Sequence, residues 1–130
     1  MKSNVDVIKD LYANFASGDM DRIRSLLSEN IVWTQMRGFP GGGRHIGVDK
    51  VFEKVFQKFD REWTDWQAVV TDYLDAGDAV IAIGFYEGTF SLTSKSFRAE
   101  FAHHYQLNDG KVILFQQYTD TFIIQEVMKT

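Results

Sequence analysis

The sequence contains no cysteine among its 130 residues. Disulfide bonds, thiolate nucleophiles and thiolate metal ligands are therefore excluded. Long apolar runs are also missing: no stretch approaches the roughly 18 apolar residues of a spanning helix, and the opening MKSNVDVIKD has no apolar signal core. We therefore expect a cytoplasmic protein that does not enter a membrane.

Positive charge is neither abundant nor clustered. The chain has 14 Lys and Arg against 18 Asp and Glu, for a net charge of −4, and its basic residues are scattered among the acidic ones. A nucleic-acid interface needs a basic patch or stripe, so nucleic acid is excluded as a partner.

Aromatic residues, in contrast, are numerous: 11 Phe, 5 Tyr and 3 Trp. So many rings in a small domain form either an aromatic core or an apolar cavity lined by rings. Hydrophobic content of 45% with 25% charged residues is typical of a globular protein. No repeat or linker divides the sequence, so residues 1–130 are expected to form a single domain.

The first half of the sequence has helical periodicity. Residues 4–17 predict an amphipathic helix capped by Ser3 or Asn4, and a shorter helix runs from Asp19 or Asp21 to residues 29–30. Residues 31–35 predict a strand. A third helix is expected over residues 49–61, with a wide apolar stripe that includes Phe52, Phe56 and Phe59.

The segment 37–47, RGFPGGGRHIG, holds the only proline and three consecutive glycines. It lacks the lysine and hydroxyl of a phosphate-binding P-loop and the GxGxxG spacing. We therefore expect it to be a mobile flap over the entrance of a pocket.

From Asp65 onward the hydrophobic period becomes two, which predicts four consecutive antiparallel strands. The last two form a hairpin over residues 101–121, closed by the turn Asn108-Asp109-Gly110.

Alternation along this hairpin assigns its side chains to faces. Phe101, His103 and Tyr105 share one face of the first strand, opposite Ala102, His104 and Gln106. On the second strand one face holds Leu114, Gln116, Tyr118 and Asp120, and the other holds Phe115, Gln117 and Thr119, unless a bulge shifts the phase near the strand end.

These elements predict an α+β fold in which a curved antiparallel sheet packs on three N-terminal helices to form a cone. The helix stripe faces the concave side, and we expect a cavity inside the cone. Strands such as AVIAIGF are apolar on both faces, so the convex face predicts a homodimer.

Several segments together resemble one known family: FASGD, LLSENIVW, GFPGGGRHIGVDKVF, the AGDAV turn and FAHHYQLNDGKVILFQQYTDT. They are similar to the SnoaL-like, ketosteroid-isomerase-like branch of the nuclear-transport-factor-2-like superfamily, which has a cystatin-like cone fold. The resemblance covers essentially the whole sequence. It implies the fold more strongly than the reaction, because this superfamily includes isomerases, polyketide cyclases, epoxide hydrolases and proteins without catalysis.

The resemblance differs in quality between these activities. The ketosteroid isomerase base falls near Thr34 or Gln35, and its oxyanion-hole tyrosine falls near Phe15; neither side chain can do that chemistry. Its protonated acid falls on His103. Epoxide hydrolases need an Arg-x-Asp pair on a strand that here reads GFYE. The polyketide cyclase pattern fits better, because its acid/base aspartate near the end of the last strand matches Asp120.

The candidate catalytic residues are therefore Asp120, as acid/base, and His103, which would polarise a carbonyl oxygen. The alternatives are a surface aspartate at a strand end and a neutral core histidine. The residues expected to line a pocket, or to fill the core instead, are Trp33, Gln35, Phe56, Phe59, Tyr86, Phe101 and Tyr118.

No cofactor is implied. A metal site is excluded because His103 and His104 point to opposite faces and His45 lies on a loop. Two functions remain: cofactor-free proton transfer on a hydrophobic carbonyl compound, of the isomerase or cyclase type, and binding of a small hydrophobic ligand without chemistry.

Overall fold

The computed structural model describes residues 2–130 and has the expected α+β fold. Its six-stranded sheet has the order β2-β1-β6-β5-β4-β3. The strands are β1 (Leu27–Gln35), β2 (Gly43–Ile46), β3 (Trp63–Ala76), β4 (Ala79–Phe90), β5 (Lys95–Asn108) and β6 (Lys111–Thr119). Neighbouring strands are antiparallel except β1 and β6, which are parallel. The four consecutive antiparallel strands predicted from Asp65 onward are confirmed as β3 to β6. The sheet as a whole is mixed and not antiparallel throughout, because no hairpin joins β1 to β6 and no short turn fixes their relative direction.

The helices are α1 (Asn4–Ser17), α2 (Met20–Leu26), α3 (Val48–Val51), α4 (Gln57–Glu62) and α5 (Thr121–Met128), with a π-helical turn, η1 (Phe52–Phe56), between α3 and α4. Ser3 caps α1 in a capping box with Asp6, and Asp19 caps α2. The predicted third helix is present as the continuous segment α3-η1-α4. The second helix ends earlier than predicted, because Leu27 already begins β1 and is buried there.

Two segments differ in kind from the prediction. Residues 43–46 of the expected flap form β2, which pairs with β1, so only residues 36–42 remain as a loop. The hairpin was expected to extend to residue 121, but β6 ends at Thr119 and α5 begins at Thr121. The apolar residues Phe122 to Ile124 fit the periodicity of a strand and that of a helix. The carboxylate of Asp120 caps the helix N-terminus and so favours the helix.

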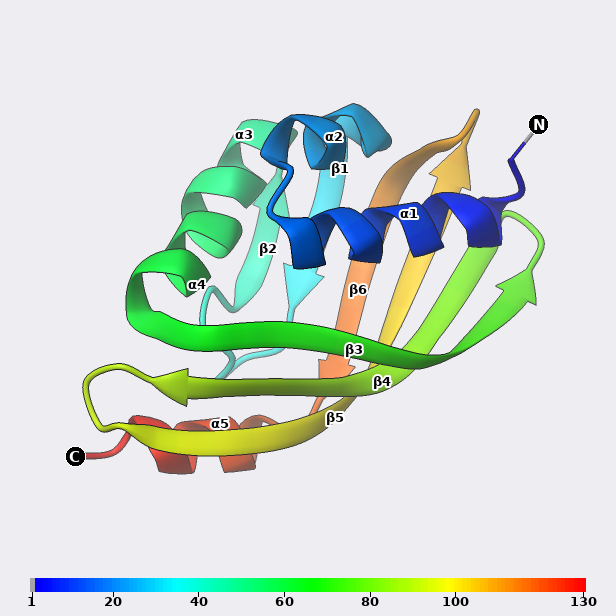
Figure 1. The fold of residues 1–130 in the computed structure, drawn as a ribbon. Helices are drawn as coiled ribbons and strands as arrows, with labels where there is room; N and C mark the ends of the chain where they lie inside the picture. The colour runs from blue at the N-terminus through cyan, green and yellow to red at the C-terminus, as the bar shows by residue number, and fades with distance from the viewer. Residues whose placement is uncertain (1) are drawn as a thin grey trace.

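The sheet is strongly curved, as Figure 1 shows. β3 has irregular pairing with β4 at two places, one of them opposite Gly84, between Val70 and Asp72. A Cβ on Gly84 would lie 1.9 Å from the carbonyl oxygen of Val69, so only glycine allows the two backbones to approach this closely. Bulges and glycine at a bend are the usual means of curving a sheet.

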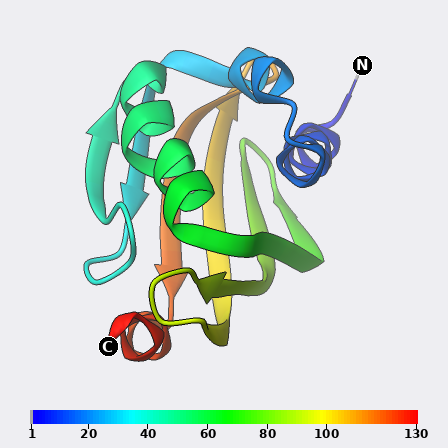
Figure 2. The same cartoon turned by 60° about the vertical axis from the view of Figure 1, so that its left-hand side comes forward.

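The helices α1 to α4 lie on the concave side of the sheet, and α5 packs near the ends of β4 and β5 (Figures 1 and 2). On the convex side lie the more exposed residues that alternate with the buried ones along β4, β5 and β6. Two clusters of buried residues fill the cone, one under α1 to α3 and one near α5. The second cluster contains Tyr86, whose hydroxyl group contacts the polar residue that the candidate site is built around.

Candidate functional site

His103 lies at the centre of the cone, on the inner face of β5. It is paired with Ala82 of β4 on one side and with Gln117 of β6 on the other, and only 3% of its surface is exposed. Both imidazole nitrogens contact hydroxyl groups: Nδ1 is 2.5 Å from Tyr12 Oη, and Nε2 is 2.5 Å from Tyr86 Oη. The predicted face of Phe101, His103 and Tyr105 is thus confirmed as the inner one.

The hydrogen bonds continue beyond His103 at both ends. Tyr105 Oη donates to Tyr12 Oη over 2.7 Å, and Gln117 Nε2 donates to Tyr86 Oη over 2.8 Å. Gln117 Oε1 accepts from the backbone N–H of Met36, at the start of the loop 36–42. We call Tyr105, Tyr12, His103, Tyr86 and Gln117 the buried polar network.

All members of this network are uncharged near neutral pH. Burial lowers the pKa of His103 well below its usual range, and burial raises the pKa of Tyr12, Tyr86 and Tyr105. Among residues 2–130, no carboxylate is hydrogen-bonded to any of them. The network can therefore donate and accept hydrogen bonds, and it offers no fixed charge.

Aromatic rings surround the Tyr86 end of the network. We call the following set the aromatic cluster: Phe39, Phe59, Trp63, Trp66, Tyr86, Phe90, Phe97 and Phe101. Trp66 stacks on Phe59 with ring centroids 4.1 Å apart, and Phe101 stacks on the imidazole of His103 at 3.8 Å. These side chains pack against one another in the part of the cone where a cavity was expected.

Phe39 is the one ring of this cluster that the loop 36–42 contributes. Its centroid lies 5.0 Å from that of Tyr86, and the side chain is buried. Side chains hold the loop at three carbonyl groups: Gln35 donates to Pro40, Gln125 to Gly38, and His45 to Gly41. Gly41 also packs on the π-helical turn, since a Cβ there would lie 2.9 Å from the carbonyl oxygen of Lys54.

Six of the seven predicted pocket residues lie inside the cone. Trp33, Gln35, Tyr86 and Phe101 are buried, and Phe56 and Phe59 are half-buried and pack against the core. Tyr118 does not lie there: it is on the convex face and 52% exposed. Its strand alternates in the predicted phase, which places Tyr118 opposite the buried Phe115 and Gln117.

Asp120 and His103 do not share a cavity, and that prediction is wrong. Asp120 is exposed and caps α5, where its carboxylate accepts a hydrogen bond from the backbone N–H of Ile123. The strand ends one residue before it, so the chain turns away from the cone.

Sequence reasoning missed three members of the buried polar network: Tyr12, Tyr105 and Gln117. Tyr12 looked like one more apolar residue of the α1 stripe. Tyr105 shares a face with His103, and Gln117 shares one with Phe115, so alternation placed both correctly without indicating a polar role. A glutamine on the inner face of a strand was the available signal, because a buried amide needs partners.

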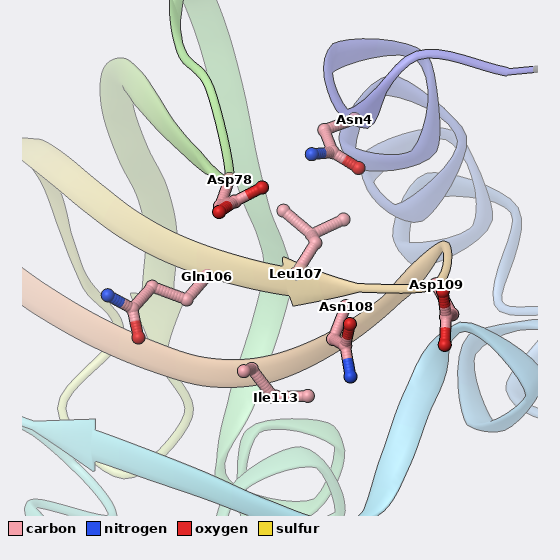
Figure 3. A pocket seen from close by; sticks show the side chains of 7 residues that line it. All are labelled: Asn4, Asp78, Gln106, Leu107, Asn108, Asp109 and Ile113. Carbon is pink, nitrogen blue, oxygen red and sulfur yellow. The ribbon is translucent and has the colours of Figure 1, made fainter.

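Two surface depressions lie outside the cone. One, of about 280 Å³, is lined by Arg98, Ala99, Glu100 and Asp120. The other, of about 460 Å³, lies beside the turns at the ends of β3 and β5 (Figure 3). It is lined mainly by amide and carboxylate side chains, with Leu107 and Ile113, and none of its residues belongs to the buried polar network.

No helix in the described part of the chain is long and apolar enough to cross a membrane. The three histidines lie in different surroundings. His45 bonds to the loop 36–42, His103 is buried in the core, and His104 is on the convex face.

Comparison with known proteins agrees with the geometry. Residues 8–115 match the SnoaL-like domain family. A search of curated proteins finds no match. Among solved structures, an NTF2-like protein from Burkholderia thailandensis is 32% identical over 100% of both chains, with a TM-score of 0.95.

Two more distant structures share the fold. TerC, co-crystallised with polyporic acid, is 22% identical over 98% of both chains, with a TM-score of 0.87. A protein with a ketosteroid-isomerase-like fold from Catenulispora acidiphila, in complex with trimethylamine, is 14% identical over 87% of this chain and 84% of that one, with a TM-score of 0.75. The match over residues 8–115 and the predicted cone lead to one assignment: the chain belongs to the SnoaL-like domain family.

Proposed function

We propose that this protein binds a small hydrophobic molecule inside the cone, among the rings of the aromatic cluster, with Tyr86 and His103 at the polar end of the site. The observation that carries the proposal is the buried polar network itself. Burying hydroxyl, amide and imidazole groups costs free energy even when they are paired, and a packed core of this size does not need them.

The entrance we propose is the loop 36–42. Phe39 is the ring that could leave the cluster without disturbing a helix or a strand, since the loop is held to its surroundings by a few side-chain hydrogen bonds. Binding of a small molecule is compatible with this fold, because TerC and the Catenulispora protein were crystallised with small molecules.

Titration calorimetry with the hydrocarbon 2-isopropenylnaphthalene tests the proposal. We expect wild-type protein to bind it, and Phe39→Ala to bind it more tightly because the substitution leaves space beside Tyr86. Phe122→Ala is the matched control, since Phe122 is 72% exposed on α5, and it should bind like the wild type. Absence of binding by all three proteins would contradict a ligand site in the cone.

Cofactor-free proton transfer on a carbonyl compound is a second candidate function. It is favoured by the Tyr86 hydroxyl beside His103, because a donor in a dry interior stabilises an enolate oxygen strongly, while a solvent water or hydroxide takes the proton from the carbon. The measurement is exchange of the methyl protons of 2-acetylnaphthalene in D₂O. A catalyst would accelerate it, Tyr86→Phe would slow it, and the exposed Asp120→Asn would leave it unchanged; exchange at the buffer rate would leave a binding protein.

We also propose a homodimer formed through the convex face of the sheet. Exposed and half-buried apolar residues form a row there across three strands: Ile83 of β4 pairs with Ala102 of β5, which pairs with Tyr118 of β6.

A cytoplasmic location stays a prediction.

A further inference from the structure

The orientation of Gln117 fixes one end of the buried polar network. A backbone N–H can only donate, so the atom facing Met36 N must be Oε1, at 3.0 Å. The amide nitrogen therefore faces Tyr86 and donates to its hydroxyl oxygen. Tyr86 Oη thus accepts at least one hydrogen bond.

The Tyr105 end of the network sets the order of donors and acceptors. Tyr105 donates to Tyr12, which leaves the hydroxyl hydrogen of Tyr12 to be donated to His103 Nδ1. A neutral imidazole carries one N–H, so when Nδ1 accepts, the hydrogen is on Nε2 and is donated to Tyr86. Tyr86 Oη then accepts from both His103 and Gln117, and its own hydrogen has no acceptor among residues 2–130.

The opposite tautomer would leave the unpaired hydrogen on Tyr12 instead. Tyr12 belongs to α1, and its ring is enclosed by Phe15, Tyr73 and Tyr105. Tyr86 lies against Phe39, the ring carried by the loop. Only at Tyr86 can an acceptor from outside the fold reach the unpaired hydrogen by displacing a loop residue.

A second buried donor in the same cluster is independent of this reasoning. Trp63 is 5% exposed, and its Nε1 has no hydrogen-bond partner in the described part of the chain. Trp66 links it to Tyr86, with ring centroids 5.1 Å from Trp63 and 5.2 Å from Tyr86. Buried donors without acceptors are rare and call for an explanation.

We propose that the ligand of this site carries a carbonyl or enolate oxygen that accepts a hydrogen bond from Tyr86 Oη, with Trp63 Nε1 as a second donor. The site offers donors and ring faces, and no carboxylate among residues 2–130 is hydrogen-bonded to the network. It therefore selects a flat ketone, quinone or enolate over a protonated amine. This inference rests on the proposed function of binding in the cone.

The tautomer of His103 tests the inference without any ligand. In ¹⁵N-labelled wild-type protein, long-range ¹H–¹⁵N correlations of the imidazole should show the hydrogen on Nε2. A hydrogen on Nδ1 would overturn the inference, because Tyr86 would then donate to His103 and have nothing to give a ligand.

A pair of matched ligands tests the recognition itself. 2-Acetylnaphthalene and 2-isopropenylnaphthalene differ only in C=O against C=CH₂. In wild-type protein we expect the ketone to bind about three- to tenfold more tightly, the usual net effect of one neutral hydrogen bond. Tyr86→Phe should abolish this preference, and Tyr118→Phe, the same change on the convex face, should keep it.

Equal affinity for the two compounds in the wild type, or a preference that survives Tyr86→Phe, would overturn the inference while leaving the proposed function intact. If neither compound bound, the proposed function would fail, and the inference that rests on it would fail as well.

Discussion

The residue that distinguishes this interior is His103, a titratable group held between two tyrosines. Desolvation disfavours its charged form, so burial keeps the imidazole neutral in the folded protein. A neutral histidine can act as both donor and acceptor, and the hydrogen bonds to Tyr12 and Tyr86 use both capacities. The same property should make the stability of the fold depend on pH.

We expect the free energy of unfolding to fall as the pH is lowered below about 6.5, the pKa of histidine in an unfolded chain. Below that pH the unfolded chain takes up a proton at residue 103 and the folded protein does not, until the much lower folded pKa is reached. This contributes up to about 1.4 kcal/mol per pH unit. Urea denaturation between pH 7.5 and about pH 5 measures the slope.

His103→Gln should flatten that slope, because glutamine can form hydrogen bonds and does not titrate in this range. His104→Gln, one residue away on the convex face, is the matched control and should keep the wild-type slope. Equal slopes in wild type and His103→Gln would mean that His103 is not held neutral by the fold.

At the scale of elements, the junction between β6 and α5 explains why Asp120 was misplaced. Asp120 accepts from Ile123 N as an N-cap, a role for which aspartate and asparagine are both well suited. The cap fixes where α5 starts, and α5 in turn buries Ile124 and Val127 against the aromatic cluster. The side chain thus affects the site through the helix it starts.

Asp120→Ala should therefore lower the free energy of unfolding by about 1 kcal/mol, the usual cost of losing an N-cap, and Asp120→Asn should cost much less. Thermal or urea unfolding of the two variants measures this difference. If both variants were as stable as wild type but lost ligand binding, Asp120 would act at a binding site and not as a cap.

The elements that were predicted correctly have strong local signals. Ser3 with Asp6 begins α1, Asn108 to Gly110 close the hairpin, and alternation gives the inner face of β5. The elements that were missed depend on distant partners. β2 exists because Gly43 to Ile46 pair with β1, and the parallel contact of β1 with β6 joins residues far apart in the sequence.

The candidate site also has a part that local sequence patterns predict and a part that depends on distant residues. Alternation alone placed His103 on the inner face, but the residues that bond to it come from α1 and β4, and no pattern in the sequence indicates that Tyr12 and Tyr86 meet the same imidazole. The family resemblance pointed to Asp120 by its position near the last strand. Whether such a side chain faces the cone depends on whether the strand ends before or after that residue.

For the whole molecule, the convex face of the sheet is the feature that the fold leaves without a helix layer (Figures 1 and 2). Ile83, Tyr118 and Ile46 are 38%, 52% and 60% exposed on that side. A contiguous apolar surface on a sheet face is typical of an interface, and a stable dimer buries about 800 Å² on each partner. A second copy of this chain would bring an identical face of the right shape.

Sedimentation velocity at micromolar concentration should therefore give the mass of a dimer for the wild type. Ile83→Lys should shift the protein to monomer, because it places a charge in the row formed with Ala102 and Tyr118, where a dimer contact would desolvate it. Leu92→Lys is the matched control: Leu92 is 75% exposed in the turn between β4 and β5, away from that row, and its replacement should leave the dimer intact. A wild-type protein that sediments as a monomer would refute the dimer, and equal dissociation by both substitutions would move the interface away from the convex face.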